Sequence, residues 1–205
     1  MDGSIENIIF DLGGVILNID YQLTEKAFIS LGLQDFSRMY TQAAQTGLFD
    51  NYEKGTCSTP YFINALLDFL PPNTSANKVV AAWNAMILEF PTQNLHLLQR
   101  LKSEYRIFLL SNTNDIHLQA VNRALQRVSN ENNLSGFFEK TYYSFEIGMR
   151  KPDAEIFNKV CLENDLEFDK TLFIDDTEKH ILGAKDIGLK THLFAAGTTL
   201  DQLFS

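Results

Sequence analysis

Six polar side chains stand directly after apolar runs or in the loop that follows one, and their types could do chemistry if the fold brings them together. The runs "NIIF", "RIFLL" and "TLFI" have the composition of strands, and "GMRKPD" follows the strand-like "KTYYSF". If these strands are parallel, their carboxyl ends meet at one edge of a sheet, where ligands bind. The six residues are Asp11, Ser111, Asn112, Lys151, Asp175 and Asp176.

Asp11 has the features of a nucleophile or a metal ligand. It follows three apolar residues, which predicts that it leaves a buried strand at the ligand-binding edge. A carboxylate there can attack phosphorus and form an aspartyl-phosphate, which splits one difficult hydrolysis into two steps. The alternative is that Asp11 only closes the strand in an Asx-type turn.

Asp175 and Asp176 are adjacent acids, and adjacent acids repel each other unless a cation holds them. Mg²⁺ prefers oxygen ligands and is often bound by one or two carboxylates, a phosphate oxygen and several waters. The pair therefore predicts a magnesium site if Asp11 lies nearby. The alternative is that the two acids begin a helix, because negative charge is favourable at a helix N-terminus.

Ser111, Asn112 and Lys151 are candidate phosphate-binding groups. A hydroxyl, an amide and an ammonium can all donate to phosphoryl oxygens on which negative charge develops. Taken singly, Ser and Asn are common in loops, and Lys151 could be one surface lysine among many, with Arg150 as an exposed neighbour. Their shared position after strand signals favours the functional interpretation.

The elements that must position these groups alternate between strand and helix from residue 91 onward. The pattern predicts helices in "TQNLHLLQRLKSEY", "DIHLQAVNRALQRV", "PDAEIFNKVCLENDL" and "EKHILGAKDIG", with strands between them and a last strand in "KTHLFA". Such alternation predicts an α/β fold with a parallel sheet covered by helices on both faces. Residues 22–90 show helical patterns only, interrupted by "GLFDNYEKGTCSTP" and "LPPNTS", which we interpret as breaks.

The composition limits the classes of partner. The 205 residues carry a net charge of −9, which disfavours general binding to nucleic acid or to an anionic membrane, whereas a small phosphorylated metabolite needs only a few local cations. No apolar run is long enough to span a bilayer. Two distant cysteines, Cys57 and Cys161, and the lack of a secretory leader predict a reduced, cytoplasmic protein, which we expect to be a monomer or a homodimer.

The stretches "FDLGGVI", "LSNTN", "GMRKP" and "FIDD" resemble the four motifs of the haloacid dehalogenase-like (HAD) hydrolase superfamily. The likeness is closest to the branch that includes bacterial α-glucose-1-phosphate phosphatases, whose first motif also reads Asp-Leu-Gly. It implies a Rossmann-like three-layer core formed by residues 1–17 and 92–205, with a helical cap inserted at residues 18–91. It also implies Mg²⁺-dependent hydrolysis of small organic phosphate monoesters, including sugar phosphates, through an aspartyl-phosphate on Asp11.

The resemblance assigns a metal site by position. Asp11, the backbone carbonyl of Gly13 and Asp176 would hold Mg²⁺. Asp175 would support a water molecule bound to the metal. The carbonyl of Gly13 can serve as a ligand because that role needs no side chain.

The resemblance also makes Lys151 catalytic and lets Lys151, Ser111 and Asn112 hold the phosphate group. Two departures from the family pattern follow. Gly13 replaces the aspartate that, in most phosphatases of the family, protonates the leaving oxygen and later activates water. His180 stands where many relatives carry Asp or Asn, so it either alters the network around the metal or lies on a helix surface.

The missing acid at Gly13 predicts a preference for leaving groups that depart readily, such as an anomeric sugar hydroxyl, or help from the cap. A general acid contributes about 10²–10⁴-fold in rate. Asp50, Tyr52 and Glu53 are candidates for that help, although a solvated turn is the alternative for each. The missing acid is also compatible with a dehalogenase, in which the aspartate attacks carbon, or with a catalytically idle phospholigand-binding protein.

Aromatic residues recur at helical spacing in the predicted cap. Phe62, Phe69, Trp83 and Phe90 follow this spacing, which predicts that they pack inside the cap. Tyr21, just beyond the first strand, is a candidate for the lining of the substrate pocket.

Overall fold

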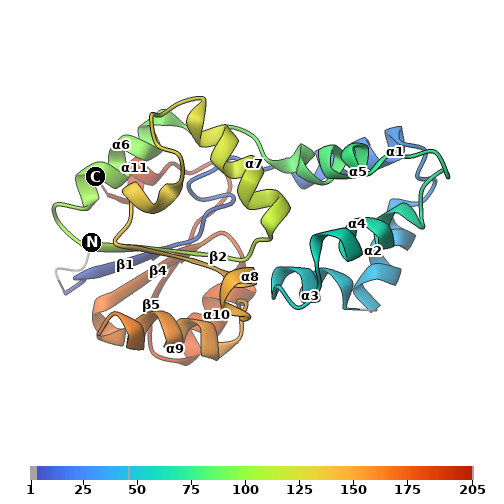
Figure 1. Ribbon diagram of the computed structural model, residues 1–205. Helices are drawn as coiled ribbons and strands as arrows, with labels where there is room; N and C mark the ends of the chain where they lie inside the picture. The colour runs from blue at the N-terminus through green and yellow to red at the C-terminus, as the bar shows by residue number, and fades with distance from the viewer. Residues whose placement is uncertain (1–3, 46, 205) are drawn as a thin grey trace.

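The centre of the protein is a five-stranded sheet, seen in the computed structural model, which describes residues 4–45 and 47–204 (Figure 1). The strand order is β3-β2-β1-β4-β5, and every neighbouring pair is parallel. The parallel sheet confirms the predicted α/β fold. The strands are β1 (Asn7–Phe10), β2 (Arg106–Ser111), β3 (Lys140–Tyr143), β4 (Thr171–Asp175) and β5 (Lys190–Leu193).

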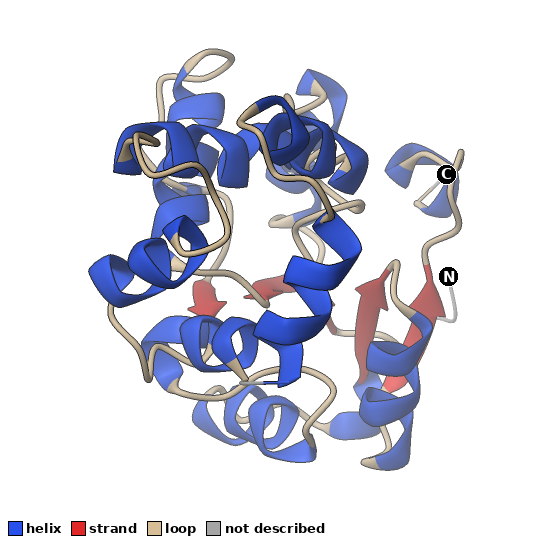
Figure 2. Cartoon of the chain, turned by 90° about the vertical axis from the view of Figure 1, so that its right-hand side faces the viewer, coloured by secondary structure: helices blue, strands red, loops and turns tan. Residues whose placement is uncertain are grey.

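Helices cover both faces of the sheet, and Figure 2 shows the red strands within the core with blue helices around them. Ile8 and Phe10 of β1 face one helical layer and Ile9 faces the other, and all three are fully buried. The first layer contains α6 (Thr92–Leu101), α7 (Asp115–Gln126) and α11 (Leu200–Leu203), and the second contains α9 (Ala154–Glu163) and α10 (Glu178–Asp186). The short helices of the core are η2 (Leu134–Gly136), α8 (Ser144–Ile147) and η3 (Phe168–Lys170).

A second group of helices follows β1 and packs around a separate apolar cluster, which includes Phe28, Phe62 and Val79 and which Ile116 of α7 joins from the core. Figure 1 shows this group to the right of the sheet. Two chain segments connect it to the core, and they run side by side through an antiparallel bridge between Ile19 and Ile87. The helices of this group are α1 (Tyr21–Ser30), α2 (Phe36–Gln45), α3 (Leu48–Glu53), α4 (Thr59–Leu67), α5 (Ala76–Trp83) and η1 (Asn84–Met86).

Two helix predictions in this group differ from the structure. Residues 48–53, predicted as part of a break, form α3, which begins after Gly47 in the left-handed conformation (φ 67°). The helical pattern predicted to continue to residue 90 ends as an α-helix at Trp83. The chain is extended at Ile87 because this residue pairs with Ile19 in the connection to the core.

Two further predictions differ at the level of single residues. The strand predicted in "KTYYSF" ends at Tyr143, because Ser144 begins α8 and its hydroxyl bonds to the backbone of Thr113. Phe90, predicted to pack inside the cap, is instead buried in the cluster between the sheet and α6, since the chain has already returned to the core at this point. Phe62 does pack among the α1–α5 helices.

The described part of the chain contains neither a helix that could span a bilayer nor a disulfide. None of the described helices combines the length and the apolar character needed to cross a bilayer. Cys57 and Cys161 are both free thiols. Burial raises the pKa of Cys161 to about 12, so this thiol stays protonated.

Candidate active site

The carboxyl ends of β1 and β4 define the position of the site. The chain passes from β1 to β2 on one side, whereas β4 lies on the other side of β1, so the strand order reverses between β1 and β4. Ligands of open α/β sheets bind at such a reversal. Asp11 follows β1 there, and its N–H donates to the carbonyl of Ile174 at 2.9 Å, which brings Asp11 beside Asp175 and Asp176.

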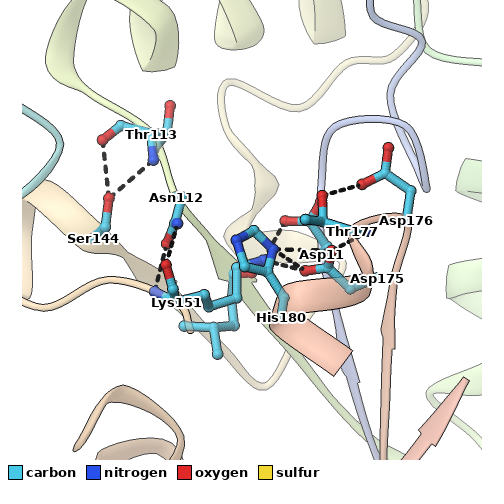
Figure 3. A network of polar contacts seen from close by, with 10 residues as sticks. Asp11, Asn112, Thr113, Ser144, Lys151, Asp175, Asp176, Thr177 and His180 are labelled. Carbon is cyan, nitrogen blue, oxygen red and sulfur yellow. Dashed lines mark hydrogen bonds and ion pairs between the residues drawn. The ribbon is translucent and has the colours of Figure 1, made fainter. Parts of the chain in front are cut away.

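Lys151 joins these acids from the loop after β3, and its ammonium lies between two carboxylates (Figure 3). Nζ is 2.6 Å from Oδ1 of Asp11 and 2.6 Å from Oδ2 of Asp175, and it donates to the carbonyl of Leu110 at 3.0 Å. The side chain is completely buried. Burial alone lowers the pKa of Lys151, but the two carboxylates outweigh burial and raise the pKa above its ordinary value. Lys151 is therefore a fixed positive charge within the site.

The side chain of Asn112 holds the backbone of Lys151. Oδ1 of Asn112 accepts from the Lys151 N–H at 2.9 Å, and Nδ2 donates to the Lys151 carbonyl at 2.9 Å. The sequence does not predict this positioning contact, nor the one made by Ser144, whose hydroxyl accepts from the N–H of Thr113 at 2.9 Å and donates to its carbonyl at 3.0 Å. Ser111 is buried at the end of β2 and lines the same cavity as Asn112.

Asp11, Asp175 and Asp176 form an acidic cluster that fits a hard divalent cation. Each offers one carboxylate oxygen, and these oxygens lie within 4.8 Å of one another. Burial raises the pKa of Asp11 to about 7 and also raises the pKa of Asp176, whereas Lys151 and His180 outweigh burial and lower the pKa of Asp175. A cation would oppose the rise at Asp11, because positive charge favours the carboxylate form. A donor set made of carboxylate oxygens is the type that Mg²⁺ prefers.

His180 packs against this cluster and is 9% exposed, so the alternative that it lies on a helix surface is wrong. Its Nδ1 is 3.0 Å from Oδ1 and 3.1 Å from Oδ2 of Asp175. The N–H of Thr177 donates to the same carboxylate at 2.8 Å. Burial lowers the pKa of His180, although Asp175 acts in the opposite direction. Asp175 is thus held by several neighbours and anchors Lys151.

Two glycines after Asp11 bring the backbone close to the acids. Gly13 lines the cavity, and Gly14 has a φ of 76°, in the left-handed region that glycine tolerates. A Cβ atom at Gly14 would lie 2.1 Å from Oδ2 and 2.8 Å from Cγ of Asp176. The lack of a side chain at Gly14 therefore makes the position of Asp176 possible.

Gly14→Ala is expected to displace Asp176 and to weaken Mg²⁺ binding by about 10–100-fold. Gly197→Ala is the matched control, because Gly197 has a φ of 83° and nothing lies within 4 Å of the added Cβ. Both variants carry the strain of the left-handed conformation, about 1–2 kcal/mol, but only the first moves an acid. Titration calorimetry with MgCl₂ measures the difference. Equal Mg²⁺ affinities for the two variants would contradict this role of Gly14.

A cavity of about 330 Å³ lies against these residues and is lined by both the core and the α1–α5 helices. Tyr21 lines it, as predicted, together with Glu53 of α3. Arg150 joins the two parts, since its Nη2 is 2.8 Å from Oε2 of Glu53 and its Nη1 contacts Asp50. The side chain of Arg150, predicted to be the exposed neighbour of Lys151, is therefore engaged between the two parts.

Tyr52, one of the three predicted helpers, does not reach the cavity. It is 3% exposed, its ring stacks on Phe62 at 4.0 Å, and its hydroxyl is 2.9 Å from Oγ1 of Thr59. It belongs to the interior of the α1–α5 helices. Glu53 does line the cavity, and burial raises its pKa although Arg150 opposes the rise.

The chain belongs to the haloacid dehalogenase-like hydrolase family, whose model matches residues 5–188. The match confirms the superfamily and the hydrolase class that the four motifs predict. The acidic cluster, Lys151 and the cavity lie where the strand order of the sheet reverses, as the motifs require.

Individual relatives extend this assignment. The chain is 32% identical to a D-ribitol-5-phosphate phosphatase from Bacteroides thetaiotaomicron over 188 residues, which cover 91% of this chain and 90% of that protein. A HAD-family enzyme from the same organism, solved in complex with magnesium and inorganic phosphate, is 34% identical with a TM-score of 0.89, covering 98% of this chain and 100% of the other. A HAD-like hydrolase from Porphyromonas gingivalis is 28% identical with a TM-score of 0.87, covering 98% and 97%.

Proposed function

We propose that this hydrolase is a Mg²⁺-dependent phosphatase that cleaves small organic phosphate monoesters through an aspartyl-phosphate on Asp11. The observation that carries the proposal is the direct contact of Asp11 with Lys151 beside Asp175 and Asp176, which combines a nucleophile, a fixed cation and metal-binding acids. The relatives from Bacteroides thetaiotaomicron support it, because one is a phosphatase and the other was solved with magnesium and phosphate.

The acids at the ends of β1 and β4 would hold the cation. Asp11, Asp176 and the backbone carbonyl of Gly13 are the proposed ligands, and Asp175 would support a bound water. Mg²⁺, when bound, neutralises charge on the phosphoryl oxygens. Lys151 contributes a second positive charge that stays in place during the reaction, because Asp175 and the Leu110 carbonyl hold it.

The proposed reaction consists of two successive displacements at phosphorus. In the first, a carboxylate oxygen of Asp11 attacks phosphorus, the bond from phosphorus to the alcohol oxygen breaks, and the aspartyl-phosphate forms. In the second, water attacks phosphorus, phosphate leaves and the Asp11 carboxylate is regenerated. The hydroxyl of Ser111 and the ammonium of Lys151 donate to the phosphoryl oxygens in both steps. Because no acid stands at Gly13, the departing alcohol oxygen takes its proton from solvent water. In the second displacement the bond from phosphorus to the Asp11 oxygen breaks, and the proton of the attacking water leaves with the product as hydrogen phosphate.

The proposed roles of the two parts follow from the cavity. Residues 1–17 and 92–205 would act as the catalytic core, and residues 18–91 as a cap that encloses the substrate, since both parts line the cavity. The likeness to a D-ribitol-5-phosphate phosphatase makes sugar-alcohol phosphates the first candidate substrates. Sugar 1-phosphates, whose anomeric oxygen departs readily, are the second.

A screen of phosphate esters with and without Mg²⁺ tests the proposal. We expect release of inorganic phosphate from sugar-alcohol or sugar phosphates, lost on chelation of the metal. A dehalogenase would instead release halide from 2-haloacids and keep its activity with a chelator. Failure of every ester to release phosphate with Mg²⁺ would overturn the proposal and favour a phospholigand-binding protein.

Gly13→Asp is expected to raise kcat on alkyl phosphates by about tenfold or more, because it supplies the absent general acid. A Cβ atom at Gly13 would lie 3.1 Å from Cδ1 of Ile19, the flexible end of a side chain that can shift. The kcat on p-nitrophenyl phosphate should rise much less, since its leaving group needs no proton. Gly13→Asn is the matched control of equal size, and equal alkyl phosphate rates for the two variants would show that acid chemistry is not involved.

A further inference from the structure

His117, in α7, is a buried polar side chain that the proposed reaction leaves without a role. It is 8% exposed and lines both the cavity beside the acids and a second cavity of about 400 Å³. Tyr21, Tyr40 and Met86 line both cavities as well, so the two are adjoining compartments of one cleft. His117 therefore stands where the phosphate-binding compartment meets the second compartment.

The second compartment has largely aromatic walls. Phe36, Phe49 and Trp83 line it together with the two tyrosines shared with the first compartment. Trp83 stacks on Phe49 with ring centroids 5.5 Å apart and 2° between their planes, which makes this wall flat. Gln22 and Glu25 of α1 also line the compartment and can bind hydroxyl groups.

The orientation of the His117 ring is fixed from two sides. Trp83 stacks on it, with ring centroids 5.1 Å apart and 5° between the planes. Nδ1 of His117 lies 2.9 Å from Oδ1 of Asn84. With Oδ1 of the Asn84 amide facing the ring, the amide accepts, which assigns the proton to Nδ1 and leaves Nε2 of the neutral ring with a lone pair. Burial lowers the pKa of His117 to about 3, so the ring is neutral near pH 7.

Nε2 of His117 has no hydrogen-bond partner within the described part of the chain, and this atom is accessible to solvent. Because His117 lines both compartments, Nε2 is open to the cleft. An acceptor at a buried cleft wall needs a donor, because an unpaired polar atom costs free energy when a ligand displaces its water. A fully ionised phosphate group has no proton to donate, so the donor must belong to the alcohol portion of the ester.

We propose that Nε2 of His117 accepts a hydrogen bond from a hydroxyl group of the alcohol portion of the substrate, whose carbon chain extends into the aromatic compartment. The proposal rests on the proposed function and narrows its substrates to phosphate monoesters of polyhydroxylated chains. His117 is then a specificity-determining residue, which distinguishes a hydroxylated chain from its deoxy counterpart at one carbon.

The test compares D-ribitol 5-phosphate, its monodeoxy analogues and p-nitrophenyl phosphate in the full chain with Mg²⁺. For the wild type, kcat/KM is expected to fall about fivefold to tenfold for one deoxy analogue. His117→Phe keeps a flat ring on Trp83 but removes the acceptor. For this variant, kcat/KM on D-ribitol 5-phosphate is expected to fall by the same factor, so that it equals the value for the sensitive deoxy analogue. On p-nitrophenyl phosphate, kcat/KM should stay within about twofold of the wild type.

His117→Gln is the second variant, because its amide oxygen can accept, and it should retain part of the discrimination. Equal turnover of all deoxy analogues by the wild type overturns the inference, even if no variant folds. An equal loss of kcat/KM by His117→Phe on p-nitrophenyl phosphate also overturns it, because it indicates a structural role only. A wild type that hydrolyses p-nitrophenyl phosphate but not D-ribitol 5-phosphate overturns it as well.

In each of these cases the turnover of p-nitrophenyl phosphate shows that the protein is still a working phosphatase. If no ester is turned over with Mg²⁺, the proposed function and this inference are overturned together.

Discussion

Asp11→Asn is expected to reduce kcat/KM for phosphate monoesters by about 10⁴-fold or more, because it removes the proposed nucleophile. An amide of the same shape is a poor nucleophile and cannot form the aspartyl-phosphate. The fold should persist, since the Lys151 ammonium keeps its 2.6 Å contact with Asp175 and the amide oxygen can still accept from it. Release of inorganic phosphate at saturating Mg²⁺ measures the effect.

Asp165→Asn is the matched control, because it makes the same chemical change in a pocket with Asn7 and Arg106, at the amino ends of the strands. Asp165 is exposed with a φ of 54°, a conformation that Asn tolerates, so activity should stay within about twofold of the wild type. Acid-quenched wild-type protein should also carry one phosphoryl group by mass, and Asp11→Asn should carry none. An Asp11→Asn variant that keeps more than about a tenth of the activity would exclude Asp11 as the nucleophile.

The positions of the acids could be predicted because buried parallel strands are nearly continuous apolar runs whose ends are easy to recognise. β1 stops at Phe10, so Asp11 falls at the edge of the sheet, and β4 ends at Asp175. Parallel pairing with matched register then brings these ends together. The α/β fold and the acidic cluster follow from these local patterns alone.

Other parts of the site depend on contacts between residues far apart in the chain. Arg150 meets Asp50 across 100 positions, and nothing in the local sequence distinguishes such a residue from a surface arginine. The buried contacts of His180 and Ser144 are equally hard to predict, because a single polar residue in a helix is normally exposed. α3 could not be predicted either, since a helix of six residues is too short to show a helical period.

The burial of Lys151 is a further case in which only the structure shows the environment. The sequence places a lysine before a proline in a loop, where most lysines are exposed. The structure shows a side chain without solvent contact, held at both its ammonium and its backbone. A side chain held in this way links the stability of the fold to the chemistry of the site.

Lys151→Met is therefore expected to lower the free energy of unfolding by about 3–5 kcal/mol, because it leaves two buried carboxylates without their cation. Oδ1 of Asp11 and Oδ2 of Asp175 each lie 2.6 Å from the ammonium that is removed. The loss of packing is small, since Met is flexible and fills a similar space. The same change removes the positive charge proposed to stabilise the phosphoryl group and should lower kcat by about 10²–10³-fold.

Lys159→Met is the matched control, because Lys159 makes a partly exposed ion pair with Glu163 one helical turn away. Its loss should cost only about 0.3–0.5 kcal/mol in urea denaturation. Added Mg²⁺ should restore part of the stability of Lys151→Met, since a cation that binds only the folded acidic cluster stabilises the folded state. The Lys159→Met variant should gain no more from Mg²⁺ than the wild type does. Equal unfolding free energies for the two variants would mean that the acids at the strand ends do not depend on Lys151 for their charge balance.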